Sequence, residues 1–183
     1  MSTIEGGMVS TNNKDFHKLL VMTRSHGWDK DLSKDPNHPF CFREVGFNLR
    51  STDLNAFIGI GQLEKLDEMR FRRHENHMLY KKLLKRFYTQ DCSAKLISSI
   101  HFALVARNAY ERTRIVNSLR EHEIETRLFT AANIGRHPFW IKRYELEKLS
   151  VSDRLYNCGL FLPNHPSIDS KDIQRIVQVV LSA

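Results

Sequence analysis

The sequence has few cysteines and no long apolar run. Its 183 residues include three cysteines, Cys41, Cys92 and Cys158, which are widely separated and form no CxxC pair. Such a set argues against a disulfide framework and against a zinc site, so we expect reduced thiols in a cytoplasmic protein. No apolar run approaches the ~20 residues of a membrane span. No signal peptide is visible either, and we expect no association with a membrane.

Several motifs of known chemistry are also absent. The sequence contains no P-loop, GxGxxG, GxSxG or HExxH motif. This argues against the nucleotide-binding, hydrolase and metalloprotease classes that these motifs mark. His74 and His77 lie three residues apart in a predicted helix, but no second pair of metal-binding side chains accompanies them. We therefore expect no metal site.

Acidic residues are outnumbered by basic ones. The 28 Lys and Arg against 21 Asp and Glu give a formal net charge of +7. This excess favours anionic partners such as phosphates, nucleotides or nucleic acid, unless an acidic second part of the protein balances it. One predicted helix carries a run of basic side chains: Arg70, Arg72, Arg73, Lys81, Lys82, Lys85 and Arg86. Such a run is typical of a solvated helix face, and a basic nucleic-acid-binding module is the remote alternative.

The first half of the chain has two segments with helical spacing of apolar residues. An asparagine at residues 12–13 can cap the first helix, and a polar side chain at residues 51–53 can cap the second. The second helix is expected to run from about residue 54 to about residue 87, which is long for a globular domain. Gly59 and Gly61 mark the place where we expect any kink or break.

The second half of the chain alternates between strands and helices. Strands are expected at residues 100–106, 124–129 and 160–163, with an earlier strand end at 8–11. Helices are expected after Asn108, at 150–158 before Gly159, and after Asp169. This alternation, with a last helix whose apolar residues form one stripe, predicts an α/β sandwich.

Two segments carry side chains suited to anions. In the segment Gly46-Phe47-Asn48-Leu49-Arg50, the amide and the guanidinium occupy alternate positions, so in an extended chain they face the same way. An amide donor beside a bidentate cation suits a phosphate oxygen, although a turn asparagine beside a surface arginine has the same sequence. Farther along, Arg127, Asn133 and Arg136 could grip an anionic substrate or form an ordinary strand and loop.

Three stretches resemble the second half of the DegT/DnrJ/EryC1/StrS sugar aminotransferases, a family of pyridoxal 5'-phosphate (PLP) enzymes. The first is STIEGGM at residues 2–8, with the helix that ends in RSHG. The second is VGFNLRSTDLNAFIGIGQLEKLDE at 45–68, which looks like the family pattern GYNxRMTDxQAAxGxxQLxxL. The third is IETRLFTAANIGRHPFW at 124–140, with GLFLPNHP at 159–166. Together they cover essentially the whole chain.

The resemblance implies an α/β fold, namely the C-terminal portion of the aspartate-aminotransferase-type PLP fold. Residues 1–52 would be a remnant of the large PLP-binding domain, residues 53–90 a long connecting helix, and residues 91–183 the small C-terminal α/β sandwich domain. The resemblance also implies a homodimer whose active sites lie between the subunits.

The resemblance further implies the site residues. The asparagine that matches Asn48 reaches across the dimer interface to the cofactor phosphate, and Arg50 lies at the same shared site. Arg50, Arg127, Asn133 and Arg136 are implied on the substrate side. The loop at residues 131–138 is similar to the GNxxRxP pattern of sugar-nucleotide 3-dehydratases. No catalytic residue is expected within the chain, because the family's lysine or histidine falls just before Met1.

The identity of that lysine or histidine decides the reaction. A lysine holds the cofactor and shuttles a proton, which gives amino transfer with glutamate as the amino donor. A histidine acts as acid and base instead, so that the sugar loses its C3 hydroxyl. We expect one of these reactions on a nucleotide-linked 4-keto-6-deoxy sugar, for polysaccharide or glycan precursors, and the third stretch favours the dehydratase-like branch. The alternative is a catalytically inactive remnant or the partner half of a split enzyme.

Overall fold

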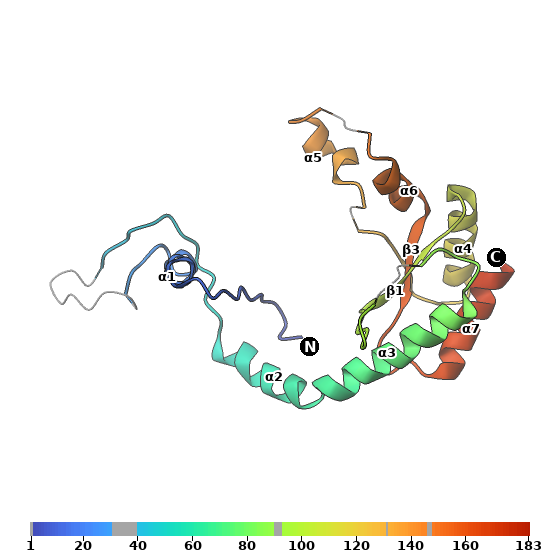
Figure 1. The fold of residues 1–183 in the computed structure, drawn as a ribbon, viewed down its shortest axis with the longest axis horizontal. Coiled ribbons are helices and arrows are strands. Elements are labelled where there is room, and N and C mark those ends of the chain that lie inside the picture. Colours follow the sequence, from blue (N-terminus) through green and yellow to red (C-terminus); the bar gives the residue numbers. More distant parts are fainter. Residues whose placement is uncertain (1, 31–39, 90–92, 131, 146–147) are drawn as a thin grey trace. The chain divides into compact units, whose positions relative to one another are not determined.

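The computed structural model describes residues 2–30, 40–89, 93–130, 132–145 and 148–183 (Figure 1). The chain divides into unit 1, residues 1–66, and unit 2, residues 67–183. Cys41 and Cys158 are free thiols, as expected, and Cys92 lies outside the described residues. In the described part of the chain, no helix is both long enough and apolar enough to cross a bilayer.

Unit 1 contains two helices that begin at predicted caps. α1 (Lys14–Thr23) is capped by Asn13, whose side-chain oxygen accepts two backbone N–H bonds from the first turn. α2 (Asp53–Glu64) is capped by Thr52, whose hydroxyl accepts one such bond. Neither helix contains a buried residue. The strand end predicted at residues 8–11 does not form, because no described segment pairs with these exposed residues.

The prediction of one long helix over residues 54–87 is wrong, because the structure has two consecutive helices there and the second ends at Leu83. The helix is interrupted at Lys65, whose N–H bonds to the Leu63 carbonyl, and it resumes as α3 (Leu66–Leu83). The interruption does not fall at Gly59 or Gly61, which lie within α2. A glycine inside a helix costs only about 1 kcal/mol relative to alanine, so glycine alone does not specify a break.

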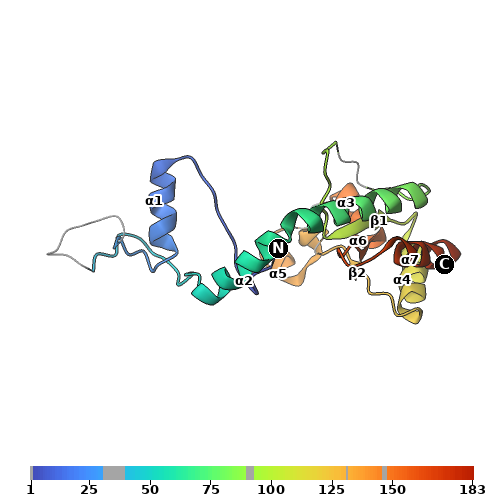
Figure 2. The same ribbon diagram turned by 90° about the horizontal axis from the view of Figure 1, so that it is seen from below.

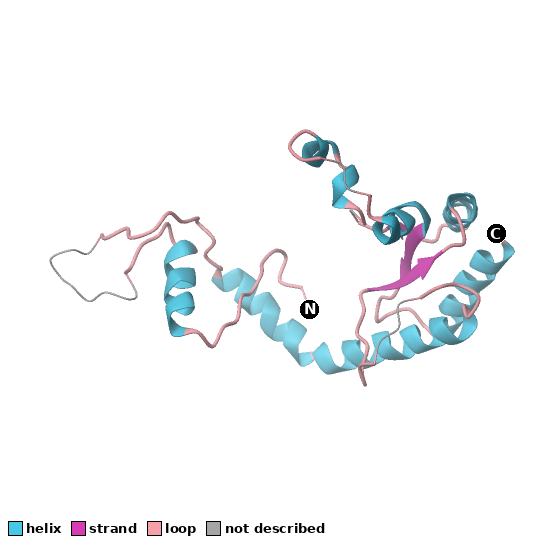
Figure 3. Cartoon of the chain, turned by 45° about the horizontal axis from the view of Figure 1, so that its top comes forward, coloured by secondary structure: helices cyan, strands magenta, loops and turns pink. Residues whose placement is uncertain are grey.

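Three antiparallel strands form the sheet of unit 2, in the order β1, β3, β2. Figure 3 draws the sheet in magenta among the helices. β1 (His101–Val105) pairs with β3 (Gly159–Pro163) along its whole length. β2 (Arg127–Leu128) pairs with the other edge of β3, with Arg127 opposite Phe161. The predicted strands near residues 100–106 and 160–163 are therefore confirmed.

The strand predicted at residues 124–129 forms only as the two residues of β2. Its first residue, Ile124, donates its N–H to the Leu119 carbonyl at the end of the preceding helix. Thr126 reaches the Phe161 carbonyl with its hydroxyl, at 2.8 Å. At the start of this segment, a hydrogen bond to the end of the preceding helix and a side-chain hydrogen bond to β3 thus replace the backbone hydrogen bonds that would pair it with the sheet.

The main helices of unit 2 follow the sequence pattern. α4 (Ala109–Glu121) is capped by Asn108, and α6 (Ser150–Cys158) ends at Gly159. α7 (Ser170–Ser182) begins at Asp169 with a reciprocal capping box to Asp172. The short 3-10 helix η1 (Ile134–Arg136) and the single-turn helix α5 (Pro138–Ile141) were not predicted.

The core of unit 2 lies between the sheet and helices α3, α4 and α7. Figures 1 and 2 both show α7 beside α4, and the two helices are in contact. The completely buried side chains include Tyr80, Phe102, Leu119, Leu160 and Ile173. Tyr80 stacks on Phe102 with ring centroids 4.9 Å apart, and its hydroxyl donates to the Pro163 carbonyl. The core therefore anchors the end of β3.

Candidate functional site

Asn48 is held by the pairing of two short segments in unit 1. Asn48 forms a bridge with Ser25, in the turn that follows α1. On either side of it, Phe47 donates its N–H to the Thr23 carbonyl at 2.7 Å, and Leu49 donates to the Arg24 carbonyl at 2.9 Å. The backbone at Asn48 is therefore fixed by the end of α1, although its side chain is exposed.

Two glycines allow this pairing. Gly27 has a φ of 80°, a left-handed conformation that favours glycine. A Cβ atom at Gly27 would overlap the Glu44 carbonyl oxygen, and one at Gly46 would lie 2.7 Å from the Thr23 carbonyl oxygen. The glycines of RSHG and VGFN are thus required by the close approach of the two segments.

The Asn48 and Arg50 side chains face the same way, as their alternate positions predict, and they also bond to each other. Arg50 Nε donates to Asn48 Oδ1 at 3.2 Å. This bond occupies the acceptor atom of the amide and leaves Asn48 Nδ2 and the two Arg50 Nη atoms as donors. Among the described residues none of these three nitrogens has a hydrogen-bond partner, and both side chains are exposed. A set of unpartnered donors that includes a guanidinium suits a phosphate group.

The N-terminal segment of unit 1 is tied to the start of α2. Asn55 Nδ2 donates to the Thr3 carbonyl at 2.5 Å and to the Glu5 carbonyl at 3.2 Å. Ser2 N–H donates to Gln62 Oε1 at 3.2 Å. The STIEGGM stretch and α2, whose bonded residues are 50 to 60 positions apart in the sequence, therefore lie together within unit 1.

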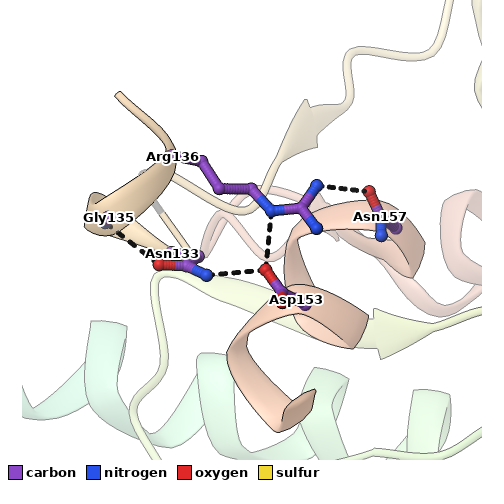
Figure 4. A network of polar contacts seen from close by, with 5 residues as sticks. All are labelled: Asn133, Gly135, Arg136, Asp153 and Asn157. Atoms are coloured by element: carbon purple, nitrogen blue, oxygen red, sulfur yellow. Dashed lines mark hydrogen bonds and ion pairs between the residues drawn. The ribbon is translucent and has the colours of Figure 1, made fainter. Parts of the chain in front are cut away.

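Asn133 and Arg136 meet at one carboxylate in unit 2 (Figure 4). Asn133 Nδ2 and Arg136 Nε both donate to Asp153 Oδ1, each at 2.6 Å. Asn133 is only 3% exposed, and its Oδ1 accepts from the Gly135 N–H. The bond from Arg136, and then that from Asn133, hold the pKa of the Asp153 carboxyl below its ordinary value. These contacts position the turn at η1 on α6.

Sequence reasoning missed the residues of α6 that receive this turn. Asp153, Tyr156 and Asn157 share one face of the helix by their i, i+3 and i, i+4 spacing. Arg136 lies with its guanidinium carbon 5.2 Å from the Tyr156 ring centroid, and its Nη1 reaches Asn157 Oδ1 at 3.5 Å. The one available signal was this polar face on a helix whose opposite side is apolar.

Arg127 lies apart from the Asn133–Arg136 pair. It is exposed on β2 and lines a pocket of about 190 Å³ to which α3 and all three strands contribute. Neither Asn133 nor Arg136 lines this pocket. The structure thus brings Asn48 together with Arg50 in unit 1, and Asn133 together with Arg136 in unit 2, and it leaves Arg127 at a separate pocket of unit 2.

The two histidines of α3 bind neighbouring protein groups. His74 Nδ1 accepts the N–H of Ile97 at 3.1 Å, and His77 Nδ1 lies 3.1 Å from Ser99 Oγ. Within the part of the chain that the structure describes, no three His, Cys, Asp or Glu side chains are grouped so that they could hold a metal ion.

Comparison with known proteins points to one family. The profile of the DegT/DnrJ/EryC1/StrS aminotransferase family matches residues 1–181. The GDP-4-keto-6-deoxy-D-mannose 3-dehydratase of Yersinia pseudotuberculosis is 27% identical over 198 residues, covering 98% of this chain and 50% of that enzyme. The GDP-perosamine synthase of Caulobacter vibrioides is 27% identical over 194 residues, which cover 97% of this chain and 47% of that enzyme. The chain spans about half the length of the curated relatives it matches.

A solved structure shares the fold. A GDP-4-keto-6-deoxymannose-3-dehydratase with a trapped PLP–glutamate geminal diamine has a TM-score of 0.81 at 24% identity. The match covers 93% of this chain and 49% of that chain. It confirms the predicted fold class, a portion of the aspartate-aminotransferase-type α/β fold. The division into residues 1–52, 53–90 and 91–183 remains a prediction.

Proposed function

This chain belongs to the DegT/DnrJ/EryC1/StrS aminotransferase family, and from that membership we propose that it forms part of a PLP-dependent enzyme. The enzyme modifies nucleotide-linked 4-keto-6-deoxy sugars in the cytoplasm, as a homodimer, and supplies precursors of polysaccharides or glycans. The observation that carries the proposal is the family match over residues 1–181. A GDP-sugar dehydratase and GDP-perosamine synthase among the relatives support this class of substrate.

Asn48 is the residue proposed to hold the cofactor phosphate, and Arg50, predicted on the substrate side, adds its guanidinium at the same shared site. Their unpartnered donors, two of them on the Arg50 guanidinium, match the oxygens of a phosphate. In the homodimer, these side chains reach the phosphate of the cofactor that the partner subunit holds. When bound, PLP supplies the electron sink for the reaction.

Arg127, Asn133 and Arg136 are proposed on the substrate side. Arg127 is exposed and offers its guanidinium to an anionic group of the substrate. Arg136 keeps Nη2 available, since its Nε and Nη1 bind Asp153 and Asn157. Asn133 is a positioning residue in this proposal, because both polar atoms of its amide already bind protein groups.

The reaction is proposed to be amino transfer from glutamate or dehydration at C3. The choice depends on the residue that faces the cofactor, a lysine or a histidine in the family. The loop around Asn133 resembles the dehydratase pattern, and the dehydratase of Yersinia pseudotuberculosis is 27% identical to this chain. The loop favours the dehydratase-like branch, whereas the identity does not discriminate, because the GDP-perosamine synthase of Caulobacter vibrioides is also 27% identical.

The test joins this chain to the half of the Yersinia pseudotuberculosis dehydratase that it does not match. The chimera receives PLP, glutamate and GDP-4-keto-6-deoxymannose, and mass spectrometry identifies the nucleotide sugars formed. We expect a 3-deoxy sugar when the cofactor-facing residue is histidine, and an amino sugar when it is lysine. A folded chimera that retains PLP and forms neither product contradicts the proposed function.

The second candidate is a catalytically inactive remnant, or the partner half of a split enzyme. The observation that favours it is the absence of any buried residue in α1 or α2. Added PLP distinguishes the cases: a stable shift of its absorbance with the purified chain alone argues against the remnant. We do not propose the nucleic-acid-binding alternative, because Arg70 and Arg72 of the basic run form ion pairs along α3.

A further inference from the structure

Two antiparallel segments of unit 1, residues 23–29 and 41–49, bond to each other, and the second of them carries Asn48. The isolated bridges between them are antiparallel. Near Asn48, three backbone hydrogen bonds of 2.7 to 2.9 Å join the segments. At the far end, Asp29 donates its N–H to the opposite segment at 3.1 Å, and Arg43 donates back at 2.9 Å. The backbone that carries Asn48 is therefore continuous with a second set of contacts, around Asp29 and Arg43.

Asp29 has the one buried side chain in the described part of unit 1. It is 2% exposed, and the other buried residue of that part, Gly27, has no side chain. Trp28 stacks on Phe40 and lies near Phe42, but both phenylalanines are more than half exposed. Neither α1 nor α2 contains a buried residue. The two segments are thus held mainly by polar contacts and not by a hydrophobic core.

The buried carboxylate forms an ion pair across the two segments. Arg43 Nε donates to Asp29 Oδ2 at 2.6 Å, and the two residues are 14 positions apart in the sequence. The Asp29 side chain is 3% exposed and that of Arg43 is 60% exposed. Burial of a carboxylate is costly unless a charged partner compensates it, so Asp29 stays buried only where Arg43 can reach it. The pair therefore favours one alignment of the two segments.

The backbone between the ion pair and Asn48 is in direct contact. The Gly27 carbonyl, two residues before Asp29, accepts the Arg43 N–H. A Cβ atom at Gly46 would overlap the Gly27 nitrogen. No side chain therefore separates the two segments at these glycines, and a shift of the backbone at Arg43 is passed on to Gly46 and Asn48.

We infer that the Asp29–Arg43 ion pair positions Asn48 and Arg50. These two side chains are exposed, so the direction of their donors depends on the backbone that carries them. The ion pair fixes that backbone from the far end of the two segments. Asp29 and Arg43 are positioning residues, and neither contacts the cofactor in this inference. It rests on the phosphate-binding role proposed for Asn48.

The test is amide hydrogen exchange of the full chain without PLP, followed by NMR at Phe47 and Leu49, whose N–H groups bond on either side of Asn48. Asp29→Ala should speed exchange there about tenfold or more, as expected for the loss of a hydrogen bond between charged groups. Arg43→Ala should do the same, because it leaves the Asp29 carboxylate buried without its partner. The double variant should exchange no faster than either single variant, since the two residues act as a pair.

Asp15→Ala is the matched control in the same unit. The Asp15 side chain is 93% exposed in an ion pair with Lys18, and its loss should change exchange at Phe47 and Leu49 less than about twofold. The amides in the middle of α2 report on unit 1 as a whole and should keep their rates. Unchanged exchange at Phe47 and Leu49 in both single variants would overturn the inference. So would additive effects, or an equal increase in α2, which would mean that the pair only stabilises unit 1 generally.

The link to the cofactor is measured separately, in the chimera with the unmatched half of the Yersinia pseudotuberculosis dehydratase. Asp29→Ala should weaken PLP retention there, although Asp29 is not placed on the phosphate. Unchanged retention in a chimera that binds PLP would overturn the positioning role. A chimera that binds no PLP contradicts the proposed function instead, and the exchange rates of the chain alone then decide the inference.

Discussion

At the scale of single residues, Asp153 Oδ1 accepts hydrogen bonds from both Asn133 and Arg136. Asn133 is almost completely buried, whereas Arg136 lies at the surface. Loss of the Asn133 amide should therefore affect stability, and loss of the Arg136 guanidinium should affect the titration of Asp153.

Asn133→Ala should lower the free energy of unfolding of unit 2 by about 1–3 kcal/mol, because it removes the bonds to Asp153 and to the Gly135 N–H. Urea denaturation followed by circular dichroism measures the change. Asn117→Ala, at an exposed asparagine of α4, is the matched control and should stay within about 0.5 kcal/mol. Equal effects of the two variants would show that the Asn133 contacts do not stabilise the protein.

Arg136→Gln should raise the pKa of Asp153 toward the ordinary value of an aspartate. In the folded protein the Arg136 guanidinium holds this pKa down. The associated stability is therefore present above the pKa of the unfolded chain and is lost as the pH falls through the lower folded pKa. The carboxyl 13C shift of Asp153, recorded against pH, reports both values. An Asp153 pKa that is the same in the variant means that the ion pair is absent in solution.

Asn48→Ala should weaken PLP retention about tenfold in the chimera with the unmatched half of the Yersinia pseudotuberculosis dehydratase. The reason is the loss of one amide donor to the phosphate, worth about 1–1.5 kcal/mol. The dissociation constant is measured by cofactor absorbance after dialysis, with Asn117→Ala again as the control. Unchanged retention would remove Asn48 from the phosphate site.

At the scale of helices and strands, the local sequence was sufficient to predict where a helix begins when a single capping side chain determines its first residue. Asn13, Thr52, Asn108 and Asp169 all cap helices as predicted, because a capping side chain bonds only to the next two or three residues. The pairing of Asn48 with Arg50 was predictable for the same reason, since it depends on alternation along one extended segment.

Features that depend on distant contacts were not predictable. The shortening of the strand at 124–129 requires the hydroxyl of Thr126 to find the Phe161 carbonyl, 35 positions away. The burial of Asn133 requires Asp153, on a helix 20 positions away. In neither case does the local pattern contain the partner, so neither the shortening of this strand nor the burial of Asn133 could be predicted.

Helices α7 and α2 should respond differently to loss of an isoleucine side chain. Ile173→Ala in α7 removes a completely buried side chain and should cost about 2–5 kcal/mol of stability. Ile60→Ala in α2, where Ile60 is 63% exposed, should change the stability of the isolated chain by less than about 0.5 kcal/mol. Denaturant unfolding measures both. A large effect of Ile60→Ala in the chain alone would mean that another copy already covers α2.

At the scale of the whole molecule, the two units differ in how well they are packed. Every member of the described hydrophobic core, from Tyr80 to Val180, belongs to unit 2. Unit 1 exposes large apolar side chains along α2, namely Leu54, Phe57, Ile60 and Leu63. Exposed apolar surface of this extent is typical of an interface. It agrees with a chain that spans about half the length of its relatives.

The cofactor absorbance of the chimera after gel filtration tests the central claim most directly. We expect a dimer that retains one PLP per polypeptide. Replacing Asn48 by Ala and Arg50 by Gln together should release the cofactor without unfolding the protein. A folded chimera that retains no PLP would contradict the account. So would a double variant that retains PLP as tightly as the unchanged protein.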